Sequence, residues 1–405
     1  MSELHRVLPQ VCLVALVLGA ATAWAAPTAS IELAAPDREY RNCPVTVEVT
    51  APDDARSAVL TDAAGKPVAG QLWRRDDRTL LTFIVAALPK GGSIAYKVAF
   101  GAEEAAAPQG VTVRKSDNGP EVLIGEALFT RYDMKNGPKP YLYPVIGPTG
   151  AGVTRNFPMK TGTPNERTDH PHHRSFWFTH DKVNGVDFWL EGARGGKQIH
   201  RAFEALESGP VMGRIRAVTD WVAPDGRKVL EDVRDIRVYN IDGARLFDWD
   251  TTARASEGPV TFGDTKEGTF GCRVAGTMKV DAKMGGAIVN SEGQKDGDAW
   301  GRPAKWVDYT GPVEEKTVGI AMLNHPTSFR HPTHWHVRTY GLFAANPFGL
   351  HDFPDGKGKD GSHTIPAGGT MPFVFRVYIH PGTTDVANVA SVYEQYANPP
   401  KAVVK

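Results

Sequence analysis

The chain has 405 residues, and its 46 lysines and arginines balance 46 aspartates and glutamates, so its formal net charge is zero. Hydrophobic residues make up 41% of the chain, which is ordinary for a globular protein. A neutral chain offers no electrostatic attraction for nucleic acid or for an anionic membrane surface, so neither partner is expected.

The first 25 residues are typical of a secretory signal peptide. Arg6 supplies a positive charge, VCLVALVLGA is a short apolar run, and Ala23-Trp24-Ala25 is a small-x-small cleavage site. The alternative is an uncleaved anchor, for which the apolar run is short. No later segment approaches the roughly 20 apolar residues that cross a bilayer. We therefore expect a periplasmic or secreted protein with no membrane insertion after signal removal.

Residues 26–116 have the pattern of a small β domain. The segment CPVTVEVT alternates, so that Val45, Val47 and Val49 share one face, and SIAYKVAF repeats this alternation. Turn-forming stretches such as LPKGGS separate the runs. We expect an immunoglobulin-like β-sandwich that supports or docks the rest of the chain.

A second domain is expected over residues 117–405, after a stretch of small, charged and turn-forming residues. TVGIAMLN and MPFVFRVYIH alternate, and only TDVANVASVYEQYA has helical spacing, with Val386, Val389, Tyr393 and Tyr396 on one face. Regular strand–helix alternation and glycine-rich phosphate loops are missing, so neither a parallel α/β fold nor a nucleotide cofactor is expected. The predicted fold is all-β, with a small immunoglobulin-like sandwich followed by a large antiparallel β-sandwich.

The mature chain keeps two cysteines, Cys43 and Cys272. An oxidising compartment permits a disulfide between them, and the sequence does not decide whether they pair. We favour the alternative of two unpaired, packed thiols.

Two histidine-rich strips stand out, TDHPHHRSFWFTH at 168–180 and HPTSFRHPTHWH at 325–336, and nine of the 13 histidines fall in or just after them. They suit metal ligands or acid–base groups, and the alternative is packed or exposed loop residues. In a strand, His334 and His336 point the same way with Trp335 opposite. These two histidines are therefore the candidate ligands for one divalent metal ion.

Two further stretches combine aromatic and hydrogen-bonding side chains. AWGRPAKWVDYTG contains Arg302, Lys305 and Trp306, a mixture that suits a sugar, because C–H faces stack on aromatic rings while hydroxyls need polar partners. A core strand with one polar face would give the same pattern. YGLFAANPFGLHDF, with Asn346 and His351, is broken by glycine and proline and predicts a loop over a binding site.

These motifs together resemble a family of secreted bacterial proteins labelled "methane oxygenase PmoA". The matching stretches span about 120–380 and are YLYPVIGPTGAGVTRNFPM, DHPHHRSFWFTHDKVNGVDFW, GDTKEGTFGCRV, WGRPAKWVDYTG and HPTHWHVRTYGLFAANPFG. A particulate methane oxygenase subunit spans the membrane several times, so the literal label does not apply. The family occurs in bacteria that degrade polysaccharides and glycosides, beside sugar dehydrogenase-like proteins, and this implies a carbohydrate or glycoside substrate.

The expected architecture is also similar to the galactose mutarotase-like supersandwich, whose members use histidines and a carboxylate for sugar acid–base chemistry. This likeness concerns the fold and does not by itself assign a function.

The residues then indicate an extracytoplasmic enzyme that cleaves a glycosidic bond, by hydrolysis or by β-elimination on a keto-sugar or a uronic acid glycoside. His172, His173 and Glu267 would supply acid–base groups, and Arg174 and Arg273 would stabilise negative charge. The excess of histidines over paired carboxylates favours elimination. The expected stacking residues are Trp177, Trp306 and Trp335. The alternatives are a non-catalytic glycan-binding protein and a sugar epimerase or mutarotase, with a copper or iron oxidase as an outside case.

Overall fold

The computed structural model describes residues 29–104 and 109–405, so the predicted signal peptide lies outside the described residues. Within these ranges almost all regular structure is strand, and the strands of each large sheet pair antiparallel. The prediction of an all-β chain with a large antiparallel sandwich is therefore confirmed. No helix in these ranges has both the length and the apolar character needed to cross a membrane.

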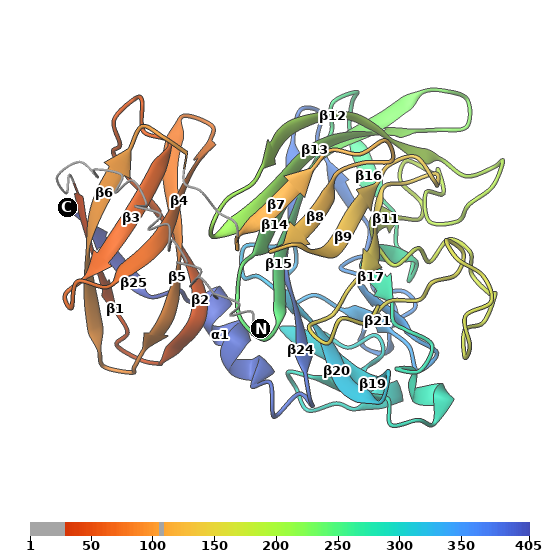
Figure 1. The fold of residues 1–405 in the computed structure, drawn as a ribbon. Helices are drawn as coiled ribbons and strands as arrows, with labels where there is room; N and C mark the ends of the chain where they lie inside the picture. Colours follow the sequence, from red (N-terminus) through yellow and green to blue (C-terminus); the bar gives the residue numbers. More distant parts are fainter. Residues whose placement is uncertain (1–28, 105–108) are drawn as a thin grey trace, which may run out of the picture.

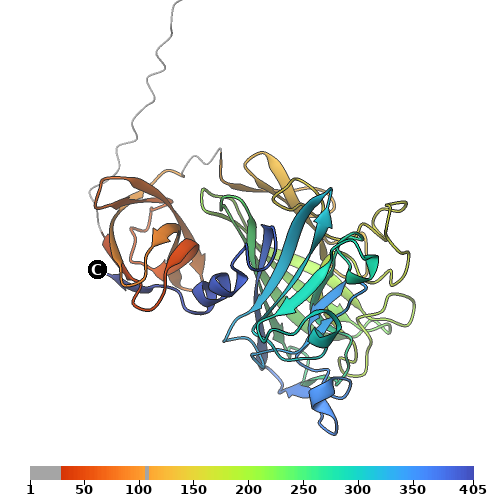
Figure 2. The ribbon, with the colours of Figure 1, turned by 90° about the horizontal axis from the view of Figure 1, so that it is seen from below.

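Seven strands form the first sheet, which curls so that its two end strands, β2 and β25, contact each other (Figure 1, Figure 2). In spatial order the strands are β2 (Tyr40–Glu48), β5 (Arg78–Leu88), β4 (Pro67–Arg75), β3 (Ser57–Asp62), β6 (Ser93–Gly101), β1 (Ala29–Ala34) and β25 (Lys401–Val404). The predicted alternation in β2 is confirmed, because Val45 and Val47 are buried while Thr46 and Glu48 are exposed. The C-terminal strand β25 pairs with β1, a return that the sequence did not predict.

Two eight-stranded sheets enclose the large core. The second sheet contains, in spatial order, β21 (Trp335–Val337), β22 (Leu342–Ala345), β17 (Gly268–Arg273), β11 (Phe176–His180), β10 (Tyr141–Val145), β9 (Ala127–Asp133), β8 (Glu121–Ile124) and β7 (Val111–Arg114). The third sheet contains β12 (Lys197–Glu207), β13 (Met212–Val222), β14 (Lys228–Tyr239), β15 (Arg245–Arg254), β24 (Thr370–Pro381), β20 (Lys316–Asn324), β19 (Trp306–Val313) and β18 (Ala287–Asn290). A short pair, β16 (Val260–Phe262) with β23 (His363–Ile365), and three 3₁₀ turns, Val280–Ala282, Asp296–Ala299 and Pro354–Gly356, complete the regular structure of the described ranges.

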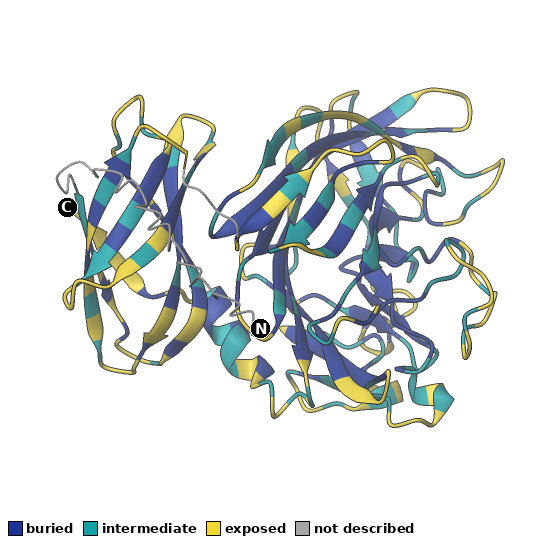
Figure 3. Cartoon of the chain, viewed as in Figure 1, coloured by how far each residue is buried: buried dark blue, intermediate teal, exposed yellow. Residues whose placement is uncertain are grey.

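The core between the second and third sheets is built from the inward residues of both. Phe270 of the second sheet stacks on Phe375 of the third, with ring centroids 4.9 Å apart. Figure 3 shows that the strands of both sheets are largely buried. Burial of this apolar surface is the main favourable contribution to folding.

The predicted C-terminal helix is confirmed as α1 (Val389–Ala397). Val389, Tyr393 and Tyr396 are buried and pack on Leu323 of the third sheet. Val386, expected on the same face, precedes the helix and is 78% exposed. The helix therefore lies between the first sheet and the large sandwich (Figure 1).

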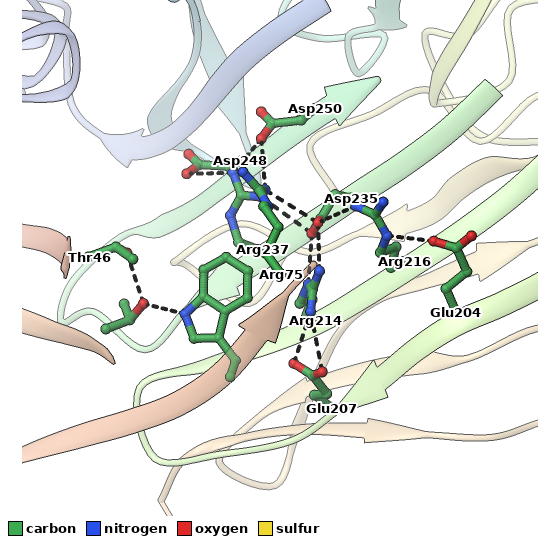
Figure 4. A network of polar contacts seen from close by, with 12 residues as sticks. Thr46, Arg75, Glu204, Glu207, Arg214, Arg216, Asp235, Arg237, Asp248 and Asp250 are labelled. Atoms are coloured by element: carbon green, nitrogen blue, oxygen red, sulfur yellow. Dashed lines mark hydrogen bonds and ion pairs between the residues drawn. The ribbon is translucent and has the colours of Figure 1, made fainter. Parts of the chain in front are cut away.

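A ladder of charged residues lies on the face of the third sheet that meets the first sheet (Figure 4). Strand register places Arg214, Arg237, Asp248 and Arg376 side by side on β13, β14, β15 and β24. Arg376 donates to Asp248 at 2.6 Å, and the guanidinium of Arg214 lies over the Trp73 ring of the first sheet. The buried charges are thus compensated by neighbours on adjacent strands.

β6, which ends at Gly101, belongs to the first sheet, and β7, which begins at Val111, belongs to the second. At the end of the chain, α1 contacts the first sheet and β25 pairs within it. The division into domains at residues 116 and 117 stays a prediction. Cys43 is buried in the first sheet and Cys272 in the large core, and both thiols are free. The favoured alternative of two packed thiols is therefore confirmed.

Candidate functional site

The outer face of the second sheet carries His170, His172 and His173 of the first histidine strip and His336 of the second. Trp177 of β11 pairs with Gly271 of β17, Gly271 with Ala344 of β22, and Ala344 with His336 of β21. Residues paired directly across antiparallel strands point to the same face. The register therefore places Trp177 and His336, which are more than 150 residues apart, on one surface. We call this surface the histidine face.

The first strip forms a turn before β11. The N–H of His173 donates to the carbonyl of His170 at 3.0 Å, and His170 has a φ of +45°. This turn stacks the His170 ring on the His173 ring, with centroids 4.9 Å apart and planes 8° apart. Tyr340 lies parallel to His170 at 5.7 Å, and Trp177 lies parallel to His173 at 5.3 Å. His172 meets His173 edge-on at 4.4 Å.

Two buried arginines hold the turn through Asp169. Arg155 donates to Asp169 at 2.8 Å, and Arg273 donates to it at 3.2 Å. Burial by itself would raise the pKa of Asp169, but the charges of Arg273 and Arg155 outweigh burial and lower it. Asp169 is therefore an ionised anchor, and its second oxygen lies 3.4 Å from Nδ1 of His170.

The contact between His173 and Arg273 fixes a tautomer. Nδ1 of His173 lies 2.9 Å from Nη1 of Arg273, and a guanidinium can only donate, so Nδ1 accepts. Burial, then the charges of His172 and Arg273, lower the pKa of His173 far below its usual value. The ring is therefore neutral and carries its proton on Nε2.

That Nε2–H group has no hydrogen-bond partner among the described residues, and the indole N–H groups of Trp177 and Trp189 have none either. The three rings lie against one another, with centroids 5.3 to 5.6 Å apart. Buried donors normally have acceptors. The cluster is therefore suited to hold an oxygen atom of water or of a ligand.

The solvent-accessible part of the histidine face contains His170, Asp169 and Glu267. Their side chains are 43%, 31% and 32% exposed. Burial raises the pKa of Glu267, and Lys266, 3.6 Å away, opposes this increase. Burial also raises the pKa of Tyr340, against the lowering effect of Arg273. Glu267 and Tyr340 therefore both favour their protonated forms more than isolated side chains do.

In the second strip, His334 and His336 both lie near Phe353, whereas His325 and His331 pack against α1. His336 lies on the histidine face, with its Nδ1 3.5 Å from the indole nitrogen of Trp300. His334 stacks on Phe353. Within residues 29–104 and 109–405, no three His, Cys, Asp or Glu side chains converge to hold a metal ion. His334 and His336 therefore do not fit the predicted metal site, because a third protein ligand is missing there.

Two hollows lie elsewhere, between the first and third sheets, with volumes of about 200 and 330 Å³. They are lined by Arg376, Arg237 and other charged residues that already form ion pairs, such as Arg237 with Asp250 at 2.7 Å. The histidine face, by contrast, has unpaired buried donors and half-exposed acid–base groups. Its chemistry makes it the stronger candidate.

A family model matches residues 120–394, more than half of the chain, and its description is "Family of unknown function (DUF6807)". The chain belongs to this family. Every predicted site residue lies within the matched region, as does the whole histidine face. The description assigns no activity to the DUF6807 family, so the methane oxygenase label stays a resemblance.

Solved structures similar to this family member include two enzymes. One is a protein in the Glycosyl Hydrolase Family 38 from Enterococcus faecalis (TM-score 0.40, 10% identity, covering 93% of this chain and 47% of that chain). The other is an alpha-mannosidase from Enterococcus faecalis V583 (TM-score 0.41, 11% identity, covering 93% and 46%). This chain spans about half the length of both, and likeness of this size carries no functional argument. No curated protein matches the sequence.

The histidine face gathers some of the predicted site residues. His172, His173, Trp177, Glu267 and Arg273 lie there, although His172 and His173 are only 7% and 1% exposed. Arg174, beside them, is held by Glu191 through two hydrogen bonds of 2.8 Å.

The remaining predicted residues pack elsewhere. Trp306 lies under α1, Trp335 points into the large core, and Asn346 is buried and donates to the carbonyl of Thr265. Arg302 pairs with Asp355, Lys305 lies over the Tyr393 ring, and the backbone of His351 is bound by Asp264. Most of these side chains already have partners in the fold, whereas the side chain of His351 is exposed, and the role of the two stretches in substrate binding stays a prediction.

Sequence reasoning missed Asp169, His170 as the exposed histidine, Arg338 and Tyr340. One pattern could have found the last two, because His336, Arg338 and Tyr340 alternate along the chain after the second strip. Arg338 and Tyr340 lie in the hairpin between β21 and β22, next to the first strip.

Proposed function

We propose that this chain is an extracytoplasmic carbohydrate-active enzyme that cleaves a glycosidic bond by β-elimination. The observation that supports this most is the arrangement of Asp169, His170 and Tyr340. An exposed imidazole is oriented by an anchored carboxylate and lies parallel to a phenol, with the two ring centroids 5.7 Å apart. A base and an acid at this separation can reach neighbouring atoms of one sugar ring.

In the proposed reaction, Nε2 of His170 removes a proton from the sugar carbon next to the ketone of a keto-sugar or the carboxylate of a uronic acid. The electron pair of that C–H bond forms a carbon–carbon double bond, and the adjacent C–O bond breaks. Tyr340 donates its proton to the departing oxygen, and its raised pKa keeps the hydroxyl protonated before the reaction. Proton exchange with water then resets both groups. His173 and Arg273 position Asp169 and His170.

Hydrolysis is the second candidate, and Glu267 favours it. Burial raises the pKa of Glu267. Lys266 opposes this increase, and the charge of the nearby Asp181 adds to it. A protonated Glu267 could act as a general acid for a leaving oxygen. Asp169 would be a weak base or nucleophile in that reaction, because two arginines bind its carboxylate and lower its pKa.

The test is a screen of glycosides with the mature chain, read by mass spectrometry and by the ultraviolet absorbance of an unsaturated product. We expect His170→Asn and Tyr340→Phe to reduce kcat by roughly 100-fold or more. His363→Asn, in β23, is the matched control and should keep wild-type turnover. Full activity of both variants would remove the proposal.

The same screen distinguishes the other candidate functions. A product that gains water and depends on Glu267 would indicate hydrolysis. Binding without any product over long incubation would indicate a glycan-binding protein, and a change of configuration without cleavage would indicate an epimerase or mutarotase.

A further inference from the structure

Arg338 is a cation on the histidine face without an anionic partner. No Asp or Glu of the described residues lies within ion-pair distance of its guanidinium, and its side chain makes no hydrogen bond there (compare Arg302, which pairs with Asp355). The guanidinium carbon lies 5.3 Å from the centroid of the Trp300 ring and 5.7 Å from that of Tyr340. Two aromatic rings therefore hold a charge that the protein leaves uncompensated.

A second such cation, Lys279, lies near the hairpin that carries Tyr340. The ammonium of Lys279 donates to the carbonyl of Asn165 at 3.1 Å and has no carboxylate within ion-pair distance among the described residues. Its side chain passes close to Gly341, the residue after Tyr340. Two carboxylates of the described residues near this part of the surface already have cationic partners: Asp169 is bound by two arginines and Glu267 lies beside Lys266. The charge of Asp281 also acts on Lys279.

We propose that Arg338 binds the carboxylate of a uronic acid residue in the substrate, so that the enzyme acts on acidic rather than neutral glycosides. A guanidinium presents two parallel N–H donors that match the two oxygens of a carboxylate. Its position beside Tyr340 places the anion next to the proposed acid and base. This inference rests on the proposed function, and it selects one of the substrate classes that the sequence left open.

The chemistry requires such a cation. The proton that His170 removes lies on the carbon that carries the carboxylate, and the electron pair of that bond moves onto the carboxylate oxygens before it forms the double bond. The anion then carries a second negative charge, which Arg338 stabilises. When the neighbouring C–O bond breaks, the departing oxygen takes the proton of Tyr340. The products are an unsaturated uronate and an alcohol.

The test compares an acidic oligosaccharide with its methyl ester, using binding and turnover separately. Trp300 lies against Arg338, so tryptophan fluorescence reports binding without requiring catalysis. We expect the wild type to bind the acid at least tenfold more tightly than the ester. Arg338→Gln should weaken binding of the acid by roughly 10- to 100-fold and leave that of the ester unchanged. The affinity of Arg338→Lys for the acid should lie between those of the wild type and Arg338→Gln. The matched control is Arg227→Gln, which changes an exposed arginine in a turn.

The outcomes are distinct from those of the proposed function. Equal affinity for acid and ester in the wild type would overturn the inference, even if Arg338→Gln failed to fold. A preference for a sulfated over a uronate oligosaccharide would overturn it as well. Acid-selective binding that requires Arg338, without any turnover, would support the inference while removing the proposed function.

Discussion

Nη1 of Arg273 lies 2.9 Å from Nδ1 of His173, and the same guanidinium lies 4.6 Å from the centroid of the Tyr340 ring. One buried side chain thus joins the first histidine strip to the hairpin after the second. Because the contacts use both terminal nitrogens of the guanidinium, Nη1 with His173 and Nη2 with Asp169, lysine cannot replace it.

Arg273→Lys is therefore expected to lower the free energy of unfolding by about 1.5 to 3 kcal/mol, the usual loss for a hydrogen bond to a charged group. Urea unfolding followed by tryptophan fluorescence measures this. Arg227→Lys, whose side chain is exposed, serves as the control and should change stability by less than about 0.5 kcal/mol. Equal losses in the two variants would mean that Arg273 does not connect the strips.

Acid should destabilise the protein through its buried histidines. Burial lowers the pKa of His336 to about 3, and burial followed by the charge of Lys139 lowers that of His172 to about 3. Between pH 3 and the unfolded value near 6.5 the unfolded chain binds more protons, so stability is complete above about pH 6.5 and falls as the pH decreases toward 3. Each histidine should lower the free energy of unfolding at pH 5 by about 2 kcal/mol relative to neutral pH.

The measurement is the urea midpoint from pH 7.5 to 4.5. His336→Gln should flatten the decline, because glutamine does not titrate, whereas the exposed His351→Gln should leave it unchanged. A decline that keeps its slope in His336→Gln would show that this histidine is protonated in the folded state.

Much of the fold could be predicted from period-two alternation. In β2 the alternating residues are the buried ones, whereas β20 is buried on both faces from Val318 to Asn324. The helix α1 follows from the spacing of Val389, Tyr393 and Tyr396. What could not be predicted is pairing between distant strands. Register depends on cross-strand contacts that no local pattern records. The pairing of β25 with β1 and that of β11 with β17 could therefore not be predicted from the sequence.

The same limit applied to the site. The two strips share a face only because β17 and β22 lie between them, with Gly271 and Ala344 in the connecting row. The strip at 168–180 contributes His170 to the exposed part of the histidine face, but the sequence prediction named His172 and His173 as acid–base groups and not His170. A turn with positive φ at His170 decides that this ring reaches solvent, and such a turn is uncommon for a histidine.

The geometry of the second strip makes a prediction about metal. His334 stacks on Phe353, His336 lies beside Trp300 and Phe353, and no third His, Cys, Asp or Glu of the described residues converges on the pair. We expect the metal content of the purified mature chain, measured by plasma mass spectrometry, to be equal in wild type and in the His334→Ala/His336→Ala double variant. A metal present in near-stoichiometric amount and lost in the double variant would contradict the arrangement described here.

Asp248 should be the most sensitive member of the charge ladder between the first and third sheets. It accepts hydrogen bonds from Arg376 at 2.6 Å and from the hydroxyl of Tyr239 at 2.7 Å, and its side chain is almost fully buried. Asp248→Asn keeps the shape but removes the charge, which leaves Arg376 buried without compensation. The expected loss in the free energy of unfolding is about 3 to 5 kcal/mol.

The control for this variant is Asp225→Asn, because the pair of Asp225 with Arg227 at 3.8 Å is exposed on both sides. Exposed pairs contribute about 0 to 1 kcal/mol, so this change should be nearly silent. Thermal or urea unfolding of the two variants gives the comparison. If Asp248→Asn lost no more stability than Asp225→Asn, water in the adjoining hollow of about 330 Å³ would have to solvate Arg376. The charge ladder would then contribute little to the stability of the contact between the two sheets.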